Sequence, residues 1–160
     1  MIESQVESMH PVVMSPPVTT NGGVASDWIS LKNVERCQVY CVLTQAVAHA
    51  TVLALYQGTA VDGTGSKVFA NAVQIWADED VATSDTLVAQ TAAVNYTVTA
   101  DIANKIVVFD IDPSLLDVAN DFDCIKVTAS DSSQATNFIS IVGVCDMKYK
   151  RATPPSVIID

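Results

Sequence analysis

Short runs of alternating apolar and polar residues, separated by turn-forming clusters, constrain the fold of this chain more than any other feature. In RCQVYCVLT, one face of an extended strand would carry Cys37, Val39, Cys41 and Leu43. Further runs are ATVLALYQG, VFANAVQIW, TLVAQTAAV, NYTVTA, KIVVFDID, FDCIKVTA and NFISIVGVCDMKY. They are rich in Val, Ile, Thr, Phe and Tyr, and Gly, Asp, Asn and Ser lie between them, as is typical of β-strands.

Helical signals are weak by comparison. No segment of helical period is long enough for the crossover of a βαβ unit. AVAHATVLALY has the Ala and Leu of a helix, but Thr51, Val52 and the flanking turn regions favour a strand. TLVAQTAAV and NYTVTA are expected to pair with each other, and PSLLDVAND predicts one helical turn after KIVVFDID ends at Pro113. Seven or eight such strands predict an all-β fold, an antiparallel β-sandwich of either the immunoglobulin-like or the jelly-roll type.

Proline-rich, apolar segments flank these runs at both ends of the chain. The first eighteen residues hold eight apolar side chains, Met1 included, together with Pro11, Pro16 and Pro17. Proline excludes a helix there and keeps the segment extended. We therefore expect an extended N-terminal arm at 1–27, a β-sandwich domain at 28–151 and an extended C-terminal tail at 152–160.

The apolar residues of the two ends are the candidate partner-binding residues. An extended segment can add a strand to an exposed sheet edge and place side chains in the pockets of a partner. The candidates are Val12, Val13, Met14, Val18, Val157, Ile158 and Ile159. On this hypothesis the arm before Trp28 contributes little to the folding of the domain and much to attachment. The alternative is that both ends are disordered.

Charge is sparse and strongly acidic in balance. Charged residues make up 16% of the chain, whereas about 25% is usual in soluble domains, so much of the surface is expected to face protein, including further copies of this chain. The formal net charge of −10 repels phosphate backbones, so we expect no nucleic-acid partner. No apolar run approaches the roughly 20 residues of a membrane span, so we expect no membrane partner. Glu3 and Glu7 stand where a signal peptide has basic residues, which predicts a protein made and kept in a cytoplasm.

The cysteines show no ligand or redox spacing. They are Cys37, Cys41, Cys124 and Cys145, and none belongs to a CxxC pair. Their simplest role is that of small buried hydrophobic residues with free thiols. We expect no disulfide and no zinc site.

Acidic residues gather in predicted turns, where Asp side chains cap backbone N–H groups. Calcium at Asp78 and Asp80, or at Asp110 and Asp112, is an alternative, because hard cations bind several oxygens. The spacing of an EF-hand is missing, so solvated turns are the better interpretation and no metal site is expected.

No catalytic arrangement stands out. A nucleophile–His–acid triad needs a histidine that a third group orients. His10 lies in the proline-rich N-terminal segment and His49 lies among alanines. VDGTGSK has fewer glycines than a phosphate-binding loop needs, and its Lys is not followed by Ser or Thr, so it predicts a turn. We expect a protein that is not an enzyme, with no catalytic residue and no cofactor.

Four segments resemble a group of small virion proteins of tailed bacteriophages. They are SLKNVERC, AVDGTGSKVF, SDTLV and DFDCIKV, in this order between Ser30 and Val127. The resemblance implies a β-sandwich structural protein of the virion, made in the host bacterial cytoplasm. It further implies a capsid decoration or cement protein on the capsid exterior, often a trimer, which binds across subunits of the major capsid protein. The family supplies no catalytic positions.

Two other functions remain open at this point. A head-completion, head–tail connector or tail structural protein would share the same fold logic. A carbohydrate-binding β-sandwich module would need an aromatic platform, but aromatic residues make up only 6% of the chain, and Trp28 and Trp76 lie far apart in sequence.

Overall fold

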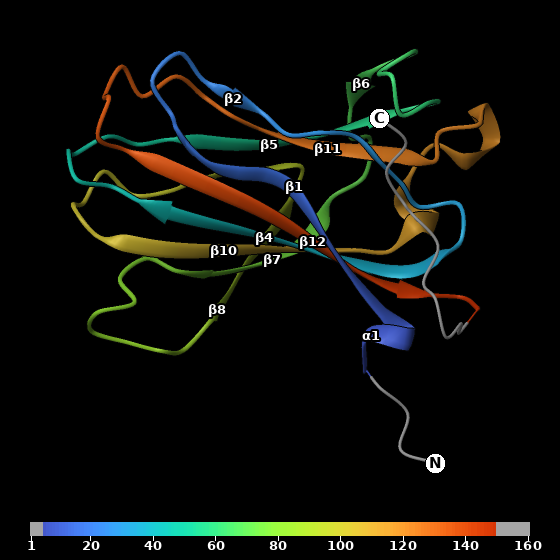
Figure 1. Cartoon of the computed structure of the whole chain (residues 1–160), viewed down its shortest axis with the longest axis horizontal. Coiled ribbons are helices and arrows are strands. Elements are labelled where there is room, and N and C mark those ends of the chain that lie inside the picture. Colours follow the sequence, from blue (N-terminus) through green and yellow to red (C-terminus); the bar gives the residue numbers. More distant parts are fainter. Residues whose placement is uncertain (1–4, 150–160) are drawn as a thin grey trace.

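The computed structural model describes residues 5–149, which form two antiparallel sheets packed face to face (Figure 1). Sheet A contains, in spatial order, β1 (Met9–Thr19), β12 (Phe138–Met147), β4 (Val34–Thr44), β10 (Asn104–Ile111), β7 (Val73–Asp78) and β8 (Val88–Ala93). Sheet B contains β2 (Val24–Ala25), β11 (Cys124–Ala129), β5 (Val52–Gly58) and β6 (Lys67–Val68), with β3 (Ile29–Ser30) beside β11 and β9 (Asn95–Thr97) beside β5. The predicted all-β antiparallel sandwich is confirmed.

Between residues 5 and 149, helical structure is limited to single turns. They are α1 (Gln5–Ser8) and the two 3-10 turns η1 (Pro113–Leu115) and η2 (Val118–Asn120), where one turn was predicted. The Asp112 carboxylate caps η1 by accepting a 2.8 Å hydrogen bond from the Ser114 N–H. Within residues 5–149, none of the helices is long and apolar enough to cross a membrane.

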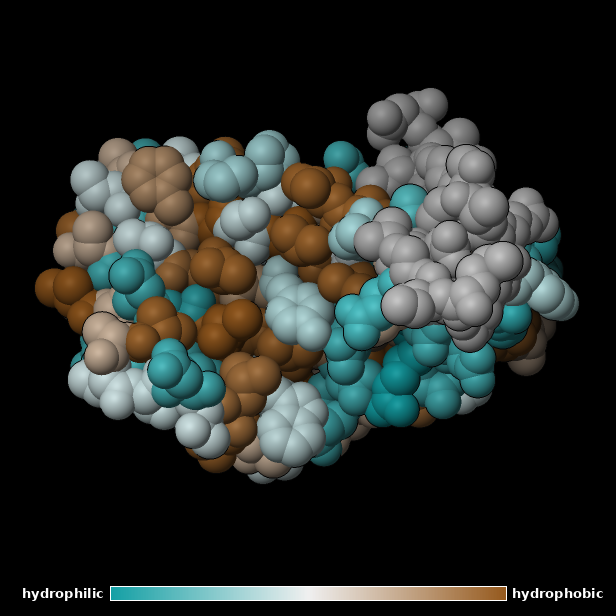
Figure 2. Space-filling view, turned by 60° about the horizontal axis from the view of Figure 1, so that its bottom comes forward, coloured by the Kyte–Doolittle hydropathy of each residue, from teal (hydrophilic) through white to brown (hydrophobic). Residues whose placement is uncertain are grey.

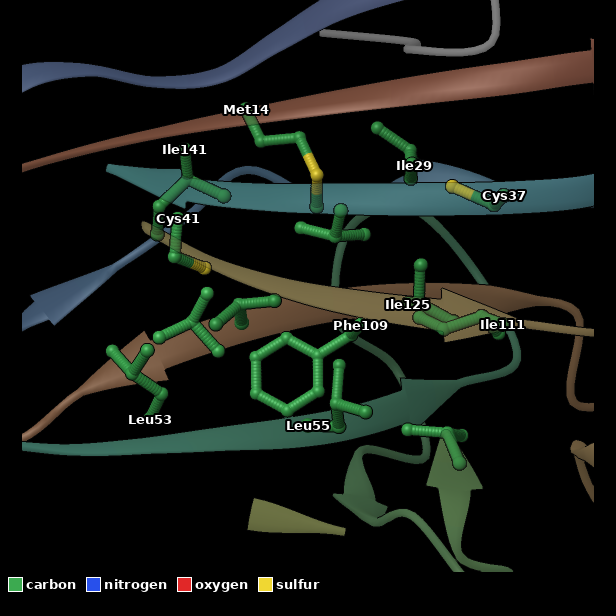
Figure 3. Close-up of a cluster of buried hydrophobic side chains, with 14 of the residues drawn as sticks. Met14, Ile29, Cys37, Cys41, Leu53, Leu55, Phe109, Ile111, Ile125 and Ile141 are labelled. Carbon is green, nitrogen blue, oxygen red and sulfur yellow. The ribbon is translucent and has the colours of Figure 1, made fainter. Parts of the chain in front are cut away.

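The core lies between the inward faces of the two sheets. In β4, at the centre of sheet A, the predicted alternation is confirmed, because Cys37, Val39, Cys41 and Leu43 are all buried. Figure 3 shows Met14, Cys41 and Phe109 of sheet A in the same cluster as Leu53 and Leu55 of sheet B. This continuous apolar layer holds the two sheets together.

Strand β1 corrects the predicted domain boundary. The segment expected to be an arm outside the sandwich pairs antiparallel with β12, from Met9 opposite Asp146 to Thr19 opposite Phe138. Proline is compatible with this position because an edge strand leaves one row of backbone groups unpaired. The sandwich therefore begins at Met9 and not at residue 28. The predicted tail at 152–160 lies outside the described residues.

Met14 joins β1 to the core. Its side chain is only 1% exposed, and it occupies the space that Gly143 of β12 leaves open. A Cβ added at Gly143 would lie 3.2 Å from the Met14 Sδ and 3.2 Å from the Ile29 Cδ1. A side chain at position 143 and Met14 would thus compete for one volume, so β12 and β1 fit each other as parts of one core.

The turn after β1 is also bonded to the rest of the fold. The Thr20 hydroxyl donates to the Ser132 hydroxyl at 2.7 Å, and the Gly22 N–H donates to the Asp131 carboxylate at 2.7 Å. The backbone N–H groups of Gly22 and Ser133 hold the pKa of Asp131 below its usual value, because they stabilise the charged form. The chain between β1 and β2 is therefore tied to the loop between β11 and β12.

Two predicted strand assignments were wrong because the chain changes sheets within them. VFANAVQIW is not one strand, since β6 belongs to sheet B and β7 to sheet A, with the buried Phe69 between them. TLVAQTAAV and NYTVTA do not pair with each other, since β8 pairs with β7 and β9 pairs with β5. The crossing occurs at Val94, whose carbonyl accepts a 3.0 Å hydrogen bond from the Leu55 N–H.

The predicted turn VDGTGSK is confirmed, and it packs against Trp28. Gly63 has a φ of +85°, and a Cβ there would lie 2.9 Å from the Trp28 Nε1, so a side chain is excluded by conformation and by space. Lys126 of β11 lies 4.8 Å from the Trp28 ring, on the outer side of sheet B. This places one of the two tryptophans on the sheet B side.

The four cysteines are buried free thiols, as predicted. Cys37 and Cys145 face each other across β4 and β12, with their Sγ atoms 3.6 Å apart. Burial raises the pKa of Cys41 to about 12, which disfavours the reactive thiolate.

One buried cation was not anticipated from sequence. Lys105 in β10 is 0% exposed, and its Nζ donates to the Thr99 carbonyl at 2.7 Å and lies 3.0 Å from the Glu79 Oε2. The Tyr96 hydroxyl donates to the other Glu79 oxygen at 2.7 Å, and burial together with this bond raises the pKa of Tyr96. These bonds connect β9 and β10 to the end of β7.

We expect Met14→Ala to lower the free energy of unfolding by about 2–5 kcal/mol, because it opens a cavity over Gly143. Its neighbour Val13 is 60% exposed, so Val13→Ala should change stability by no more than about 0.5 kcal/mol. Denaturant unfolding of the two variants measures the difference. Equal free energies of unfolding for the two variants would show that Met14 is not part of the core and that the N-terminal segment is an arm outside it.

We expect Lys105→Ala to destabilise the fold by about 3 kcal/mol, since it leaves the partly buried Glu79 carboxylate without its cation. The exposed Lys32 provides the control, and Lys32→Ala should have almost no effect. Thermal or denaturant unfolding compares the two. A Lys105→Ala protein as stable as the control would show that the ion pair contributes nothing.

Candidate docking surface

The outer face of sheet A carries apolar side chains where an antiparallel sandwich usually places polar ones. One row of residues crosses five strands in direct cross-strand register: Val13, Val142, Tyr40, Val108 and Trp76. These side chains point outward, because Val39 and Cys41 on either side of Tyr40 point into the core. Val42 and Ile106, which are also paired, lie beside the row.

We call this set of seven outward residues the sheet-A face: Val13, Tyr40, Val42, Trp76, Ile106, Val108 and Val142. Val42 is 47% exposed and Trp76 38%, whereas Val108 is buried between Tyr40 and Trp76 on the neighbouring strands. The space-filling view from the lower side of Figure 1 shows hydrophobic surface gathered in a central region (Figure 2). Contiguous apolar surface of this kind marks an interaction site in soluble proteins.

Polar residues border the sheet-A face on one side. Gln38, Asp110 and Gln74 form the adjacent cross-strand row, and Figure 2 shows hydrophilic surface to the right of the hydrophobic region. Arg36 donates two hydrogen bonds of 2.6 Å to Asp110, and these bonds raise the pKa of Arg36. The Tyr40 hydroxyl donates to Gln38 at 2.8 Å. An apolar centre with a polar border is the usual anatomy of a protein interface.

The residues predicted to bind a partner lie in different parts of the structure. Val12 and Met14 are buried in the core of this chain, so they are not available to a partner and that prediction was wrong for them. Val13 belongs to the sheet-A face, and Val18 is exposed near the end of β1. Val157, Ile158 and Ile159 lie outside the described residues.

Sequence reasoning missed the other six residues of the sheet-A face. The signal was present in KIVVFDID, where Ile106 and Val108 on the outward side are as apolar as Val107 and Phe109 on the inward side. A strand that is apolar on both faces is buried on both faces or binds something on one of them.

A cleft of about 680 Å³ lies at the end of the sandwich that carries η1 and η2. Leu31, Leu116 and Phe122 contribute apolar walls, and Asp112, Asp121 and Asp123 contribute carboxylates. Two of these carboxylates have local partners, since Asp112 caps η1 and Asp123 accepts from the Cys124 thiol at 3.1 Å. Neither histidine is among the residues that line the cleft.

The acidic turns considered for calcium are occupied by local bonds. The Asp78 carboxylate accepts from the Asp80 N–H at 3.1 Å, and the Asp80 carboxylate accepts from the Ala82 N–H at 3.1 Å. Asp110 is paired with Arg36. In the part of the chain that the structure describes, no three His, Cys, Asp or Glu side chains are grouped to hold a metal ion.

Comparison with known proteins gives only distant likenesses. No family model matches the chain, and no curated protein matches it. The crystal structure of the SPBc2 prophage-derived protein YomS aligns over 86% of this chain and 91% of its own, with 8% identity and a TM-score of 0.49.

Two structures of infectious bursal disease virus align over smaller shares of their own chains. The Gx strain structure covers 86% of this chain and 39% of its own, with 9% identity and a TM-score of 0.25. The T13 viral particle covers 91% and 43%, with 12% identity and a TM-score of 0.22. At such identities and scores, these likenesses do not indicate a function for this chain.

Proposed function

We propose that this chain is a structural protein of a bacteriophage virion, most simply a capsid decoration or cement protein. In this role it lies on the capsid exterior and binds across subunits of the major capsid protein, which stabilises the shell. The observation that carries the proposal is the sheet-A face, a broad apolar surface on a strand scaffold with a polar border.

The chemistry of the sheet-A face fits a protein partner. Complete burial of exposed side chains such as Val13, Val42 and Trp76 contributes about 1.5–3 kcal/mol each, before the costs of association are subtracted. The face holds no charged side chain among its seven residues, so it carries no unpaired charge into an interface. Many copies on one particle further raise the effective concentration of binding surfaces.

The segments that resemble phage virion proteins occupy scaffold positions. SLKNVERC leads from β3 into β4, and AVDGTGSKVF forms the turn against Trp28 and continues through β6. SDTLV leads into β8, and DFDCIKV enters β11. They shape strands and turns and hold no group positioned for catalysis. This agrees with a structural role, so we propose a protein that is not an enzyme and uses no cofactor.

A carbohydrate-binding module is less well supported. Trp28 lies beside Lys126 on the sheet B side, whereas Trp76 lies on the sheet-A face. The two tryptophans therefore do not form one aromatic platform for a sugar ring.

The proposal predicts that purified particles of the encoding phage contain this chain in many copies at symmetric positions on the head. Peptide mass spectrometry of the particles and single-particle imaging measure its presence and place. A density at the head–tail junction or on the tail would favour the connector or tail alternative. Absence of the chain from particles would contradict a virion role.

The sheet-A face should be required for attachment. We expect the double variant Val13→Thr and Val42→Thr to bind empty capsids at least about tenfold more weakly, which corresponds to ~1.4 kcal/mol. Each change keeps the shape and β preference of valine but replaces one methyl group by a hydroxyl, which is costly to bury without a hydrogen bond. The control is Val52→Thr with Val68→Thr, two exposed valines of sheet B. Co-sedimentation with capsids measures both, and equal binding of the two double variants would remove the sheet-A face as the docking surface.

A further inference from the structure

The four edges of the two sheets are protected against pairing with another chain to very different degrees. An exposed edge strand offers unpaired backbone groups to another chain, and proteins limit this with prolines, charges or very short strands. The β1 edge of sheet A carries Pro11, Pro16 and Pro17. In sheet B one edge is made of β2 and β3, with two residues each, and the other of β6 and β9, with two and three residues.

Strand β8 lacks prolines, charges and short length, and its one irregularity is a bulge in the pairing with β7, where Thr91 and Ala92 lie opposite Gln74. It is six residues long, with the sequence VAQTAA, and contains no proline and no charged residue. Four of its six side chains are exposed. It pairs with β7 on one side, and on its other side no strand of the described part of the chain pairs with it.

The neutral region around β8 is unusual for this chain. No charged residue occurs between Asp85 and Asp101, although the formal net charge of the whole chain is −10. Two copies of an acidic protein repel each other, and the repulsion is smallest where their uncharged segments meet. Thr91, near the middle of β8, is exposed and adds β preference to this segment.

We propose that β8 pairs antiparallel with β8 of a second copy of this chain, across a two-fold axis. Antiparallel pairing of identical strands is self-complementary, so one contact satisfies both copies and closes the assembly as a dimer. Sheet A then continues from one copy into the next. The two sheet-A faces lie on one continuous sheet, because Trp76 is on β7, the strand next to β8.

This dimer differs from the trimer that the resemblance to phage virion proteins implies. It also stands independently of the proposed function, because it concerns the isolated chain and needs no particle. A two-fold pair would bring two docking surfaces to a partner at once, which raises apparent affinity without a new contact.

The test is the mass of the full chain in solution, compared with a charged variant of the edge. Sedimentation equilibrium at micromolar concentration should give twice the 17.0 kDa mass of one chain. Thr91→Lys should raise the dissociation constant of the dimer at least about tenfold, since like charges would lie close together across the new pair of strands. Val68→Lys places the same charge on the β6 edge of sheet B and should leave the dimer unchanged.

A second measurement does not depend on tolerance of the lysine. Single variants Gln90→Cys, Thr91→Cys and Ala92→Cys scan the middle of β8, and mild oxidation should link at least one of them into a covalent dimer. The native cysteines are buried and should not compete, and Val68→Cys should stay unlinked. A 17.0 kDa species at all concentrations, a three-chain mass, or a dimer that resists Thr91→Lys and forms no cross-link at β8 would overturn the proposal.

Discussion

The pairing of β1 with β12 is the contact on which the rest of the structure depends. It places Met14 in the space above Gly143 and brings Ile29 into the same cluster (Figure 3). It also makes β12 an internal strand between β1 and β4, so sheet A becomes six strands wide. If β1 did not pair with β12, the apolar residues of the N-terminal segment would be left exposed to water or to another protein. With β1 in place, the surface left for a partner is the outer face of the sheet.

Much of the fold follows from local sequence pattern, and the rest depends on contacts between distant segments. The alternation of apolar and polar residues between Cys37 and Leu43 predicts the buried face of β4 correctly. Pro113 likewise marks the end of β10. The prolines of β1 were misleading, because they are typical both of an extended arm and of an edge strand. Only the pairing with β12 decides between the two. The changes of sheet near Phe69 and Val94 are likewise set by tertiary contacts, which no local pattern contains.

The docking surface was less predictable than the core for a related reason. The apolar–polar alternation of a strand identifies the residues that are suited to the core. In β10 it fails to do so, because Ile106 and Val108 on the outward side are also apolar. Their meaning appears only when cross-strand register places them beside Tyr40 and Trp76. A row of apolar residues contributed by separate strands is a property of the sheet. No single strand shows it.

The two outer faces of the sandwich differ in charge, and this difference favours sheet A over sheet B as the docking surface. Sheet B presents Lys126 between the rings of Trp28 and Tyr56, whereas sheet A presents the uncharged sheet-A face. Hydroxyl-radical footprinting of free and particle-bound protein compares the two faces within one sample. We expect Trp76 to become protected from oxidation on the particle while Trp28 stays as reactive as in the free chain. Protection of Trp28 with Trp76 unchanged would contradict this expectation.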